Sequence, residues 1–134
     1  MTRPKSTRAS RGAVAVEFAL VLPLLLLVVL GAIDYGWYFF CALGSANAAR
    51  EGARAGTTVP NGDATKAKTT AQSYLNSAGL GAQPVAINVA VAAAPTSVSV
   101  EVVMHFKPLV GFVPLPTDGG GPVAHSKVVM MGVP

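Results

Sequence analysis

Residues 13–33 read AVAVEFALVLPLLLLVVLGAI, and this stretch decides what kind of fold the rest of the chain can have. Glu17 is its only charged residue. About 20 consecutive apolar residues are enough to cross the apolar part of a bilayer as a helix. The stretch therefore predicts a membrane-spanning helix, and it raises the question of why a carboxylate lies near its start.

The predicted helix extends beyond the bilayer. After Asp34 comes a second uncharged stretch, YGWYFFCALGSANAA. Tyr35, Trp37 and Tyr38 suit the membrane–water interface, where amphipathic rings collect. One helix over about residues 13–56 would be roughly 65 Å long, about twice the apolar thickness of a bilayer. We therefore expect its second half to stand outside the membrane.

A proline interrupts the first half of this helix. Pro23 lies in the middle of the apolar run. Proline removes one backbone hydrogen bond and clashes with the preceding turn, although membrane helices tolerate it better than soluble ones. We expect a kink or local unwinding near residues 19–23.

Positive charge is concentrated at the N-terminus. The 134-residue chain has ten basic and six acidic residues, and because four of the ten precede Gly12, the remainder is neutral. A nucleic-acid-binding protein would need Lys and Arg clustered on its folded part, so no nucleic-acid partner is predicted. Basic residues beside a membrane segment stay in the cytoplasm, which would place the rest of the protein on the other side. The four residues are Arg3, Lys5, Arg8 and Arg11.

Three interpretations of the N-terminal segment compete. A secretory signal peptide would explain the basic start, and ANA at residues 46–48 is similar to an A-x-A cleavage site, but the apolar run is too long. An uncleaved membrane anchor would explain everything except Glu17. The third is a class III leader, cut by a prepilin peptidase on the cytoplasmic side between Gly12 and Ala13.

The residues around Gly12 resemble the processing site of type IV pilins and pseudopilins. Those proteins have a basic leader, a glycine and a hydrophobic helix whose fifth mature residue is glutamate. Counted from Ala13, the fifth residue here is Glu17. The later stretch NAAREGARAG, residues 47–56, narrows the resemblance to the TadE-like family, minor pilins or pseudopilins of the tight adherence (Tad/Flp) pilus system. The residues of this motif that we single out are Asn47, Arg50, Glu51 and Arg54.

The resemblance implies a function and a location. The protein would be held in the bacterial inner membrane, cut after Gly12, and would take part in the assembly or initiation of a Tad-type pilus. Its partners would be other pilins or pseudopilins, the prepilin peptidase, the inner-membrane assembly platform and the lipid bilayer. The alternative is an uncleaved, single-pass accessory module that binds partners and never enters a filament.

Glu17 needs a physical reason to be where it is. A carboxylate in an apolar span costs a few kcal/mol, of which the helix dipole returns a little. Cleavage after Gly12 would create an α-amino group at Ala13, and this group, from the same chain or a neighbour, is the nearest cationic partner. The resemblance implies that such pairing guides a new subunit into the filament. The other interpretation is that Glu17 lies among the headgroups at the cytoplasmic surface.

The outer half of the long helix has a small face and a polar face. The polar face contains the motif residues named above, and Glu51 and Arg54 can pair on it. It is either solvated or packed against the C-terminal part of the protein or a neighbour. Small side chains let another element approach closely. The small face consists of Ala42, Ala46, Ala49, Ala53 and Gly56.

The remaining residues predict a small head. Asp63 can cap a second helix over about residues 64–78, and Gly79 would stop it. Alternation predicts strands within residues 84–92 and 96–106 joined by a hairpin, and a third within 123–133. The predicted fold class is α+β, with a leader (1–12), a long transmembrane helix (13–56) and an extracytoplasmic head with one helix and a three-stranded antiparallel sheet (57–134). The expected core face of the second helix is Ala64, Ala67, Ala71, Tyr74, Leu75 and Ala78.

The loop before the third strand is unusually apolar. Residues 107–122 read KPLVGFVPLPTDGGGP. We expect them to pack beneath the sheet as ordinary core, and the other interpretation is contact with the membrane surface or with another subunit. Their apolar side chains are Leu109, Val110, Phe112, Val113 and Leu115.

No residue pattern indicates catalysis or a cofactor. His105 and His125 are too few for a metal site, so we expect solvated or hydrogen-bonded histidines. DGGG at residues 118–121 lacks the strand-to-helix context of a phosphate loop. Cys41 is predicted to be a small buried apolar residue. We therefore predict a protein that is not an enzyme and that has no cofactor.

Overall fold

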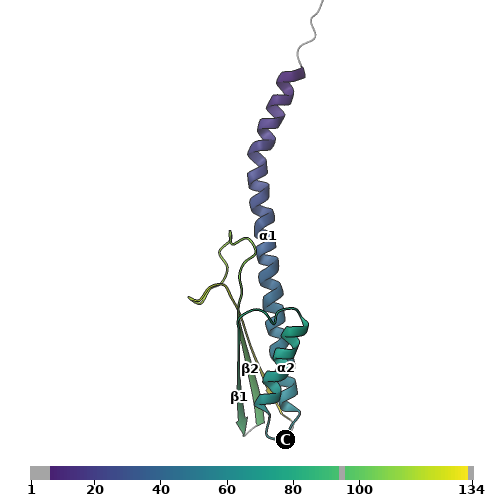
Figure 1. Cartoon of the computed structure of the whole chain (residues 1–134), viewed down its shortest axis with the longest axis vertical. Coiled ribbons are helices and arrows are strands. Elements are labelled where there is room, and N and C mark those ends of the chain that lie inside the picture. Colours follow the sequence, from purple (N-terminus) through teal and green to yellow (C-terminus); the bar gives the residue numbers. More distant parts are fainter. Residues whose placement is uncertain (1–6, 94–95, 133–134) are drawn as a thin grey trace, which may run out of the picture.

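The computed structural model describes residues 7–93 and 96–132, with side chains described from residue 12 onward except that of residue 93. Arg3 and Lys5 of the predicted leader lie outside this part. One very long helix is followed by a short helix and a three-stranded sheet, which confirms the predicted α+β class (Figure 1). The elements are α1 (Thr7–Thr57), α2 (Ala64–Ser77), β1 (Val85–Ala93), β2 (Thr96–His105) and β3 (Val123–Met131).

α1 is longer than the sequence predicted. It has 51 residues and begins at Thr7, within the predicted leader, rather than near residue 13. It stays helical through Pro23, so the unwound turn that we considered there does not form. The N-terminal half only bends gently (Figure 1). A single proline removes one hydrogen bond, and the neighbouring turns of a helix this long remain intact.

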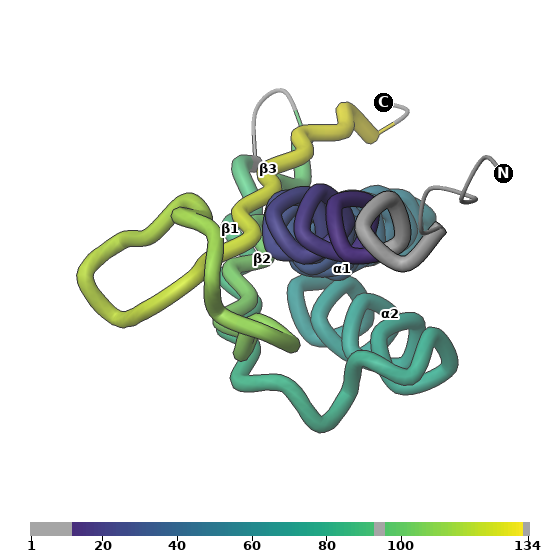
Figure 2. The backbone as a smooth tube through the Cα atoms, turned by 90° about the horizontal axis from the view of Figure 1, so that it is seen from above, coloured from purple at the N-terminus to yellow at the C-terminus, as the bar shows by residue number. Residues whose placement is uncertain are grey.

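The head has two layers. The three strands are antiparallel in the order β1-β2-β3. α1 packs against β2 and β3, while α2 packs beside α1 and against β1. Viewed along α1, the two helices lie side by side, and part of the loop before β3 projects sideways (Figure 2). The helices therefore cover one face of the sheet and leave its other face exposed.

The core of the head includes the outer half of α1. On α2, Ala67, Ala71 and Leu75 of the predicted face are buried, whereas Ala64 is exposed and Tyr74 and Ala78 are half-buried. The inward residues of β2 alternate as predicted. α1 thus belongs to two environments, with a bare first half and a second half packed into the head. The buried residues are Cys41, Ala48, Ala49 and Ala53 of α1, Val98, Val100, Val102 and Met104 of β2, and Leu80, Ile87, Phe106 and Ala124.

The ends of α2 follow local rules. The Asp63 carboxylate accepts a hydrogen bond from the Lys66 amide at 2.9 Å, as predicted for the N-cap. At the other end Gly79 has φ +76°, and the Leu80 amide donates to the Leu75 carbonyl at 2.8 Å. This is the Schellman arrangement, in which both leucines are buried in the core.

The apolar loop does not pack beneath the sheet, so our preferred prediction for it was wrong. Leu109 and Phe112 are each 62% exposed and Val110 is 42% exposed. Only Leu115, which is half-buried, packs against the core. The physical reason is that α1 and α2 already cover the inner face of the sheet, leaving no space for the loop.

Candidate functional site

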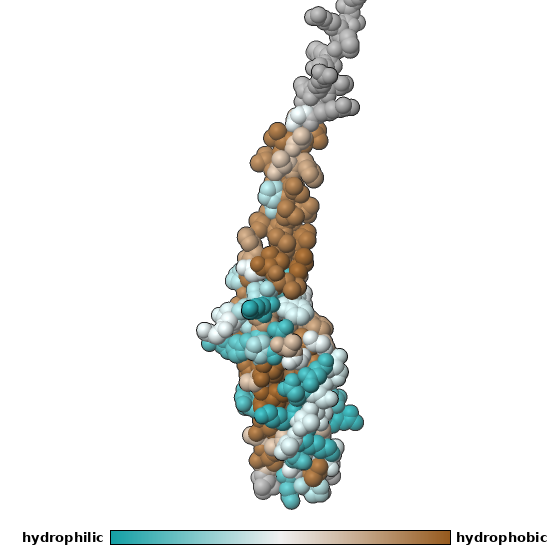
Figure 3. All heavy atoms as spheres, viewed as in Figure 1, coloured by the Kyte–Doolittle hydropathy of each residue, from teal (hydrophilic) through white to brown (hydrophobic). Residues whose placement is uncertain are grey.

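The N-terminal half of α1 is bare, because residues 12–29 are all exposed. It is the one helix in the described part of the chain that is long and apolar enough to cross a membrane, and none of its most apolar 18-residue window is buried. Figure 3 shows this as an apolar column extending from a largely polar head. An exposed apolar surface of this size indicates an interaction with lipid or with other helices.

Gly12, Ala13 and Glu17 all lie on this bare part of α1. The three residues are exposed, and a side chain added at Gly12 would meet no atom within 4 Å. Ala13 and Glu17 are four residues apart, so they share one face of the helix. Within the part of the chain with described side chains, the Glu17 carboxylate has no hydrogen bond and no ion pair.

Asp34, the second acid in α1, has the opposite environment. Its side chain is completely buried, although it lies at the end of the bare segment. Its carboxylate accepts backbone hydrogen bonds from Val110 at 2.8 Å, Gly111 at 3.0 Å and Phe112 at 3.2 Å. We call this arrangement the Asp34–loop contact. It fixes the apolar loop against α1.

The backbone of the loop is shaped for this contact. Gly111 has φ +75°, a conformation that residues other than glycine rarely adopt. Successive amides in such a turn can point at a single anion. The loop also approaches α1 one turn earlier, because a side chain atom added at Gly31 would lie 3.2 Å from Val113. The tip of the loop therefore lies beside the last turn of the bare segment.

Sequence reasoning did not find the Asp34–loop contact. The available signals were an acid that ends the apolar run and a glycine among apolar residues in a proline-rich loop. The partners are 76 to 78 residues apart in the chain. No local spacing rule connects residues at such separations.

The NAAREGARAG motif divides between two faces of α1. Arg50, Glu51 and Arg54 are exposed and Asn47 is half-buried. The possible Glu51–Arg54 pair is not present among the described side chains. The charged part of the motif is thus exposed in the described chain and does not pack against its C-terminal part.

The small face of the motif is wider than predicted. Ala48 and Gly52 are buried in addition to Ala49, Ala53 and Gly56, while Ala42 and Ala46 are half-buried. A Cβ atom added at Gly52 would lie 2.8 Å from the Ala67 carbonyl oxygen and 3.0 Å from the Ala71 Cβ atom. The glycine lets α1 and α2 approach closely.

The two histidines lie on the exposed face of the sheet. His125 Nε2 is 2.8 Å from Glu101, and His105 Nε2 is 3.0 Å from Asp118. The pKa of Glu101 lies below its ordinary value, mainly because the His125 side chain forms a hydrogen bond with it.

The pKa of Asp118 is also lowered, mainly because the Gly120 amide donates a hydrogen bond to it.

The described residues contain no cluster of three or more potential metal ligands. Cys41 is buried, as predicted.

Comparison with known families supports the resemblance seen in the sequence. Residues 12–54 match the model of the family described as TadE-like protein. This segment begins at the predicted cleavage site, includes the bare half of α1, and ends within the small and charged faces. Searches of curated proteins and of solved structures gave no match. The match is confined to this N-terminal segment of the chain. The apolar helix is compatible with a single-pass membrane anchor.

Proposed function

We propose that this protein is a pseudopilin or minor pilin that takes part in the assembly or initiation of a Tad-type pilus. The bare half of α1 spans the bacterial inner membrane, the N-terminus is cytoplasmic, and the head is extracytoplasmic. Its partners are other pilins or pseudopilins, the prepilin peptidase and the inner-membrane assembly platform. The proposal is structural rather than enzymatic, and its main support is Glu17, an acid without a described partner on a bare apolar helix that matches the TadE-like model.

The position of Asp34 supports this placement in the membrane. The head begins beside Asp34, so the outer edge of the apolar layer falls near Ile33. An apolar layer of about 30 Å corresponds to about 20 helical residues, which puts its inner edge near Val14 for an untilted helix. Glu17 then lies about 5 Å inside the cytoplasmic edge. At that depth a carboxylate is costly unless a cation compensates it.

Cleavage after Gly12 would supply such a cation. The new α-amino group on Ala13 would lie one helical turn from Glu17, or beside the Glu17 of a neighbouring subunit. An ion pair between subunits would fix the register of their helices, because both charges lie in a medium with few alternative partners. In this proposal Glu17 is an assembly residue.

N-terminal sequencing of the protein from its native membrane separates the candidate functions. Ala13 as the first residue supports the pilin function, whereas Met1 or Thr2 would support the uncleaved accessory module. Release after Ala48 is disfavoured, because Ala48 is fully buried in the head. As a control, Gly12→Leu should block cleavage and leave a longer, more basic product.

Replacing Glu17 tests the assembly step. We expect Glu17→Ala to insert in the membrane and be processed as the natural protein is, but to lose most pilus assembly when pili are counted on cells. Glu51→Gln is the matched control, because it removes an exposed acid from the other end of the same helix. Equal pilus numbers in Glu17→Ala and the natural protein would contradict the charge-pairing function.

A further inference from the structure

We propose that the loop between β2 and β3 is a second membrane contact, which inserts Phe112 and Leu109 into the outer surface of the bilayer beside α1. This inference rests on the proposed function, because it requires α1 to span the membrane. The occupant of the exposed apolar surface is lipid, in the interfacial region between headgroups and acyl chains.

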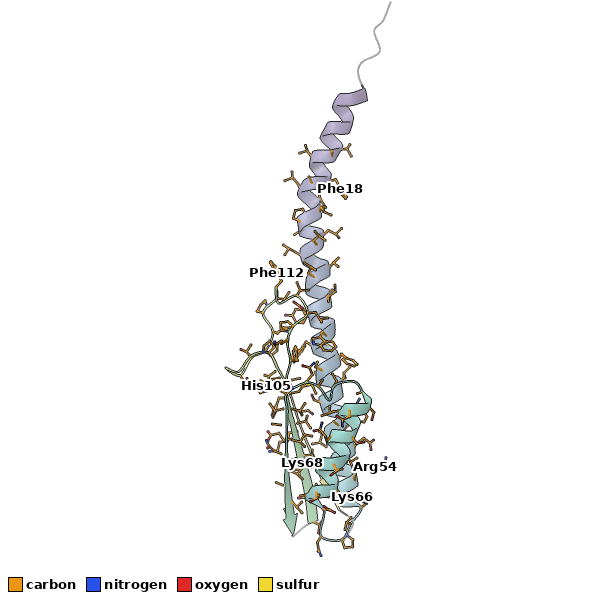
Figure 4. The ribbon with its side chains drawn as sticks, in the orientation of Figure 1. Phe18, Arg54, Lys66, Lys68, His105 and Phe112 are labelled. Atoms are coloured by element: carbon orange, nitrogen blue, oxygen red, sulfur yellow. The ribbon has the colours of Figure 1, made fainter. Side chains whose placement is uncertain are left out.

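The position of the loop points to this partner. Phe112 lies at the end of the head nearest the bare half of α1 (Figure 4). Val113 lies against Gly31, which is three residues inside the apolar segment as counted from Asp34. Three helical residues correspond to about 5 Å. Amphipathic segments that lie on membranes are buried to a similar depth, about 5–10 Å.

The loop and the adjoining end of the apolar segment both expose apolar side chains. Leu109 and Phe112 are each 62% exposed, and Ile33 of α1 is 43% exposed. These side chains are too apolar to favour contact with water. If α1 crosses the bilayer, a loop fixed at this height meets lipid without any change in conformation.

Backbone polarity would normally exclude an irregular loop from such a position, because an unsatisfied amide is costly in lipid. Here the Asp34 carboxylate accepts hydrogen bonds from Val110, Gly111 and Phe112. Pro108, Pro114 and Pro116 have no amide proton to satisfy.

The Asp34–loop contact also supplies the Asp34 carboxylate with hydrogen-bond donors. Asp34 ends the apolar segment and would otherwise bring a carboxylate to the edge of the lipid, where it would need donors. The loop covers it completely. Asp34 and the loop therefore satisfy each other's polar groups, so that together they can lie at the edge of the membrane. Neither could lie there without the other.

Depth-dependent quenching of tryptophan fluorescence tests the proposal on the full chain in lipid vesicles. The natural protein has one tryptophan, so Trp37→Phe provides a silent background. Phe112→Trp then reports on the loop, Leu25→Trp on the centre of the span, and Val129→Trp on the exposed face of β3. Far-UV circular dichroism checks that each variant folds, and Leu109→Trp replaces Phe112→Trp if the latter does not.

We expect lipids brominated near the headgroup to reduce Phe112→Trp fluorescence by about twofold or more, in keeping with interfacial burial. Lipids brominated near the chain ends should quench Leu25→Trp more strongly than the loop variant, and Val129→Trp should respond to neither. If Leu25→Trp is quenched while Phe112→Trp behaves like Val129→Trp, the loop proposal fails and the anchor stands. If Leu25→Trp is not quenched, the loop proposal and the membrane-spanning function of α1 both fail. Shielding of Phe112→Trp from lipid and from aqueous acrylamide alike, increasing with protein density, would indicate a protein partner and overturn the proposal.

Discussion

At the scale of single residues, the two acids in the N-terminal part of α1 lie in opposite environments. Glu17 is exposed on a bare helix, whereas Asp34 is buried and accepts three backbone hydrogen bonds. They are separated by 17 residues, or about 26 Å along a helix, which is close to the apolar thickness of a bilayer. Glu17 thus has no partner among the described side chains, whereas Asp34 has its partners within the fold.

The Asp34–loop contact can be tested by amide hydrogen exchange. Asp34→Ala removes the acceptor for Val110, Gly111 and Phe112, so we expect these amides to exchange faster by on the order of tenfold or more, because hydrogen bonds to charged groups are among the stronger ones. Amides in β2 should be unaffected. Glu51→Gln serves as the control for loss of one acid from α1. Unchanged protection of the three loop amides would show that the carboxylate does not hold the loop.

The exposed face of the sheet predicts a pH dependence. The pKa of Glu101 is below its ordinary value of 4.5, chiefly because of its hydrogen bond with His125. A lowered folded-state pKa contributes stability above the unfolded pKa, and this is lost as pH falls through the folded pKa.

Thermal melts in detergent should therefore show stability falling below about pH 4.5, with a smaller loss in Glu101→Gln. Identical slopes for the two proteins would refute a contribution from Glu101.

At the scale of elements, α1 combines two sequence patterns that correspond to two environments. Apart from Glu17, residues 13–33 are apolar on all sides, as expected of a helix surrounded by lipid. The second half of α1 has a small face against α2 and β2 and a charged face toward solvent. The charged residues of the NAAREGARAG motif keep one side soluble, while its alanines and glycines determine how closely α2 can pack.

Gly52→Ala tests this close packing. The new methyl group would overlap the Ala67 carbonyl oxygen, so we expect a net loss of about 1–2 kcal/mol after the gain in helix propensity. Gly36→Ala is the matched control, since its Cβ atom would meet nothing within 4 Å.

Thermal unfolding monitored by near-UV circular dichroism in detergent measures both variants. A Gly52→Ala protein as stable as Gly36→Ala would mean that α1 and α2 can separate without cost.

At the scale of the whole molecule, the head is not a separate unit attached to the end of a helix. Cys41, Ala48, Ala49 and Ala53 of α1 are completely buried beneath the sheet and α2. The boundary between the bare segment and the head therefore lies within one continuous helix. Because the helix is unbroken, the direction of its bare segment and the orientation of the head are coupled.

Two fragments test this organisation. Residues 34–134 keep all of the buried core, so we expect this fragment to fold, with dispersed amide resonances. Residues 58–134 lose the α1 contribution and should be unfolded, because a sheet of three strands with one short helix cannot bury enough apolar surface. Proton–nitrogen correlation spectra distinguish the two states. A folded 58–134 fragment would show that α1 only adds to an independent head.

Elements that depend on local pattern could be predicted from the sequence alone. The apolar run predicted the bare helix, alternation predicted the strands, and Asp63 and Gly79 marked the ends of α2, because periodicity and capping act within a few residues. Tertiary structure decided what happens between distant segments. The helices cover the inner face of the sheet and so leave the apolar loop outside. The packing of the strands against α1 brings the Val110 amide of this loop to Asp34, 76 residues away in the chain. No local pattern in the sequence predicts the Asp34–loop contact, because this contact depends on how all the elements pack together.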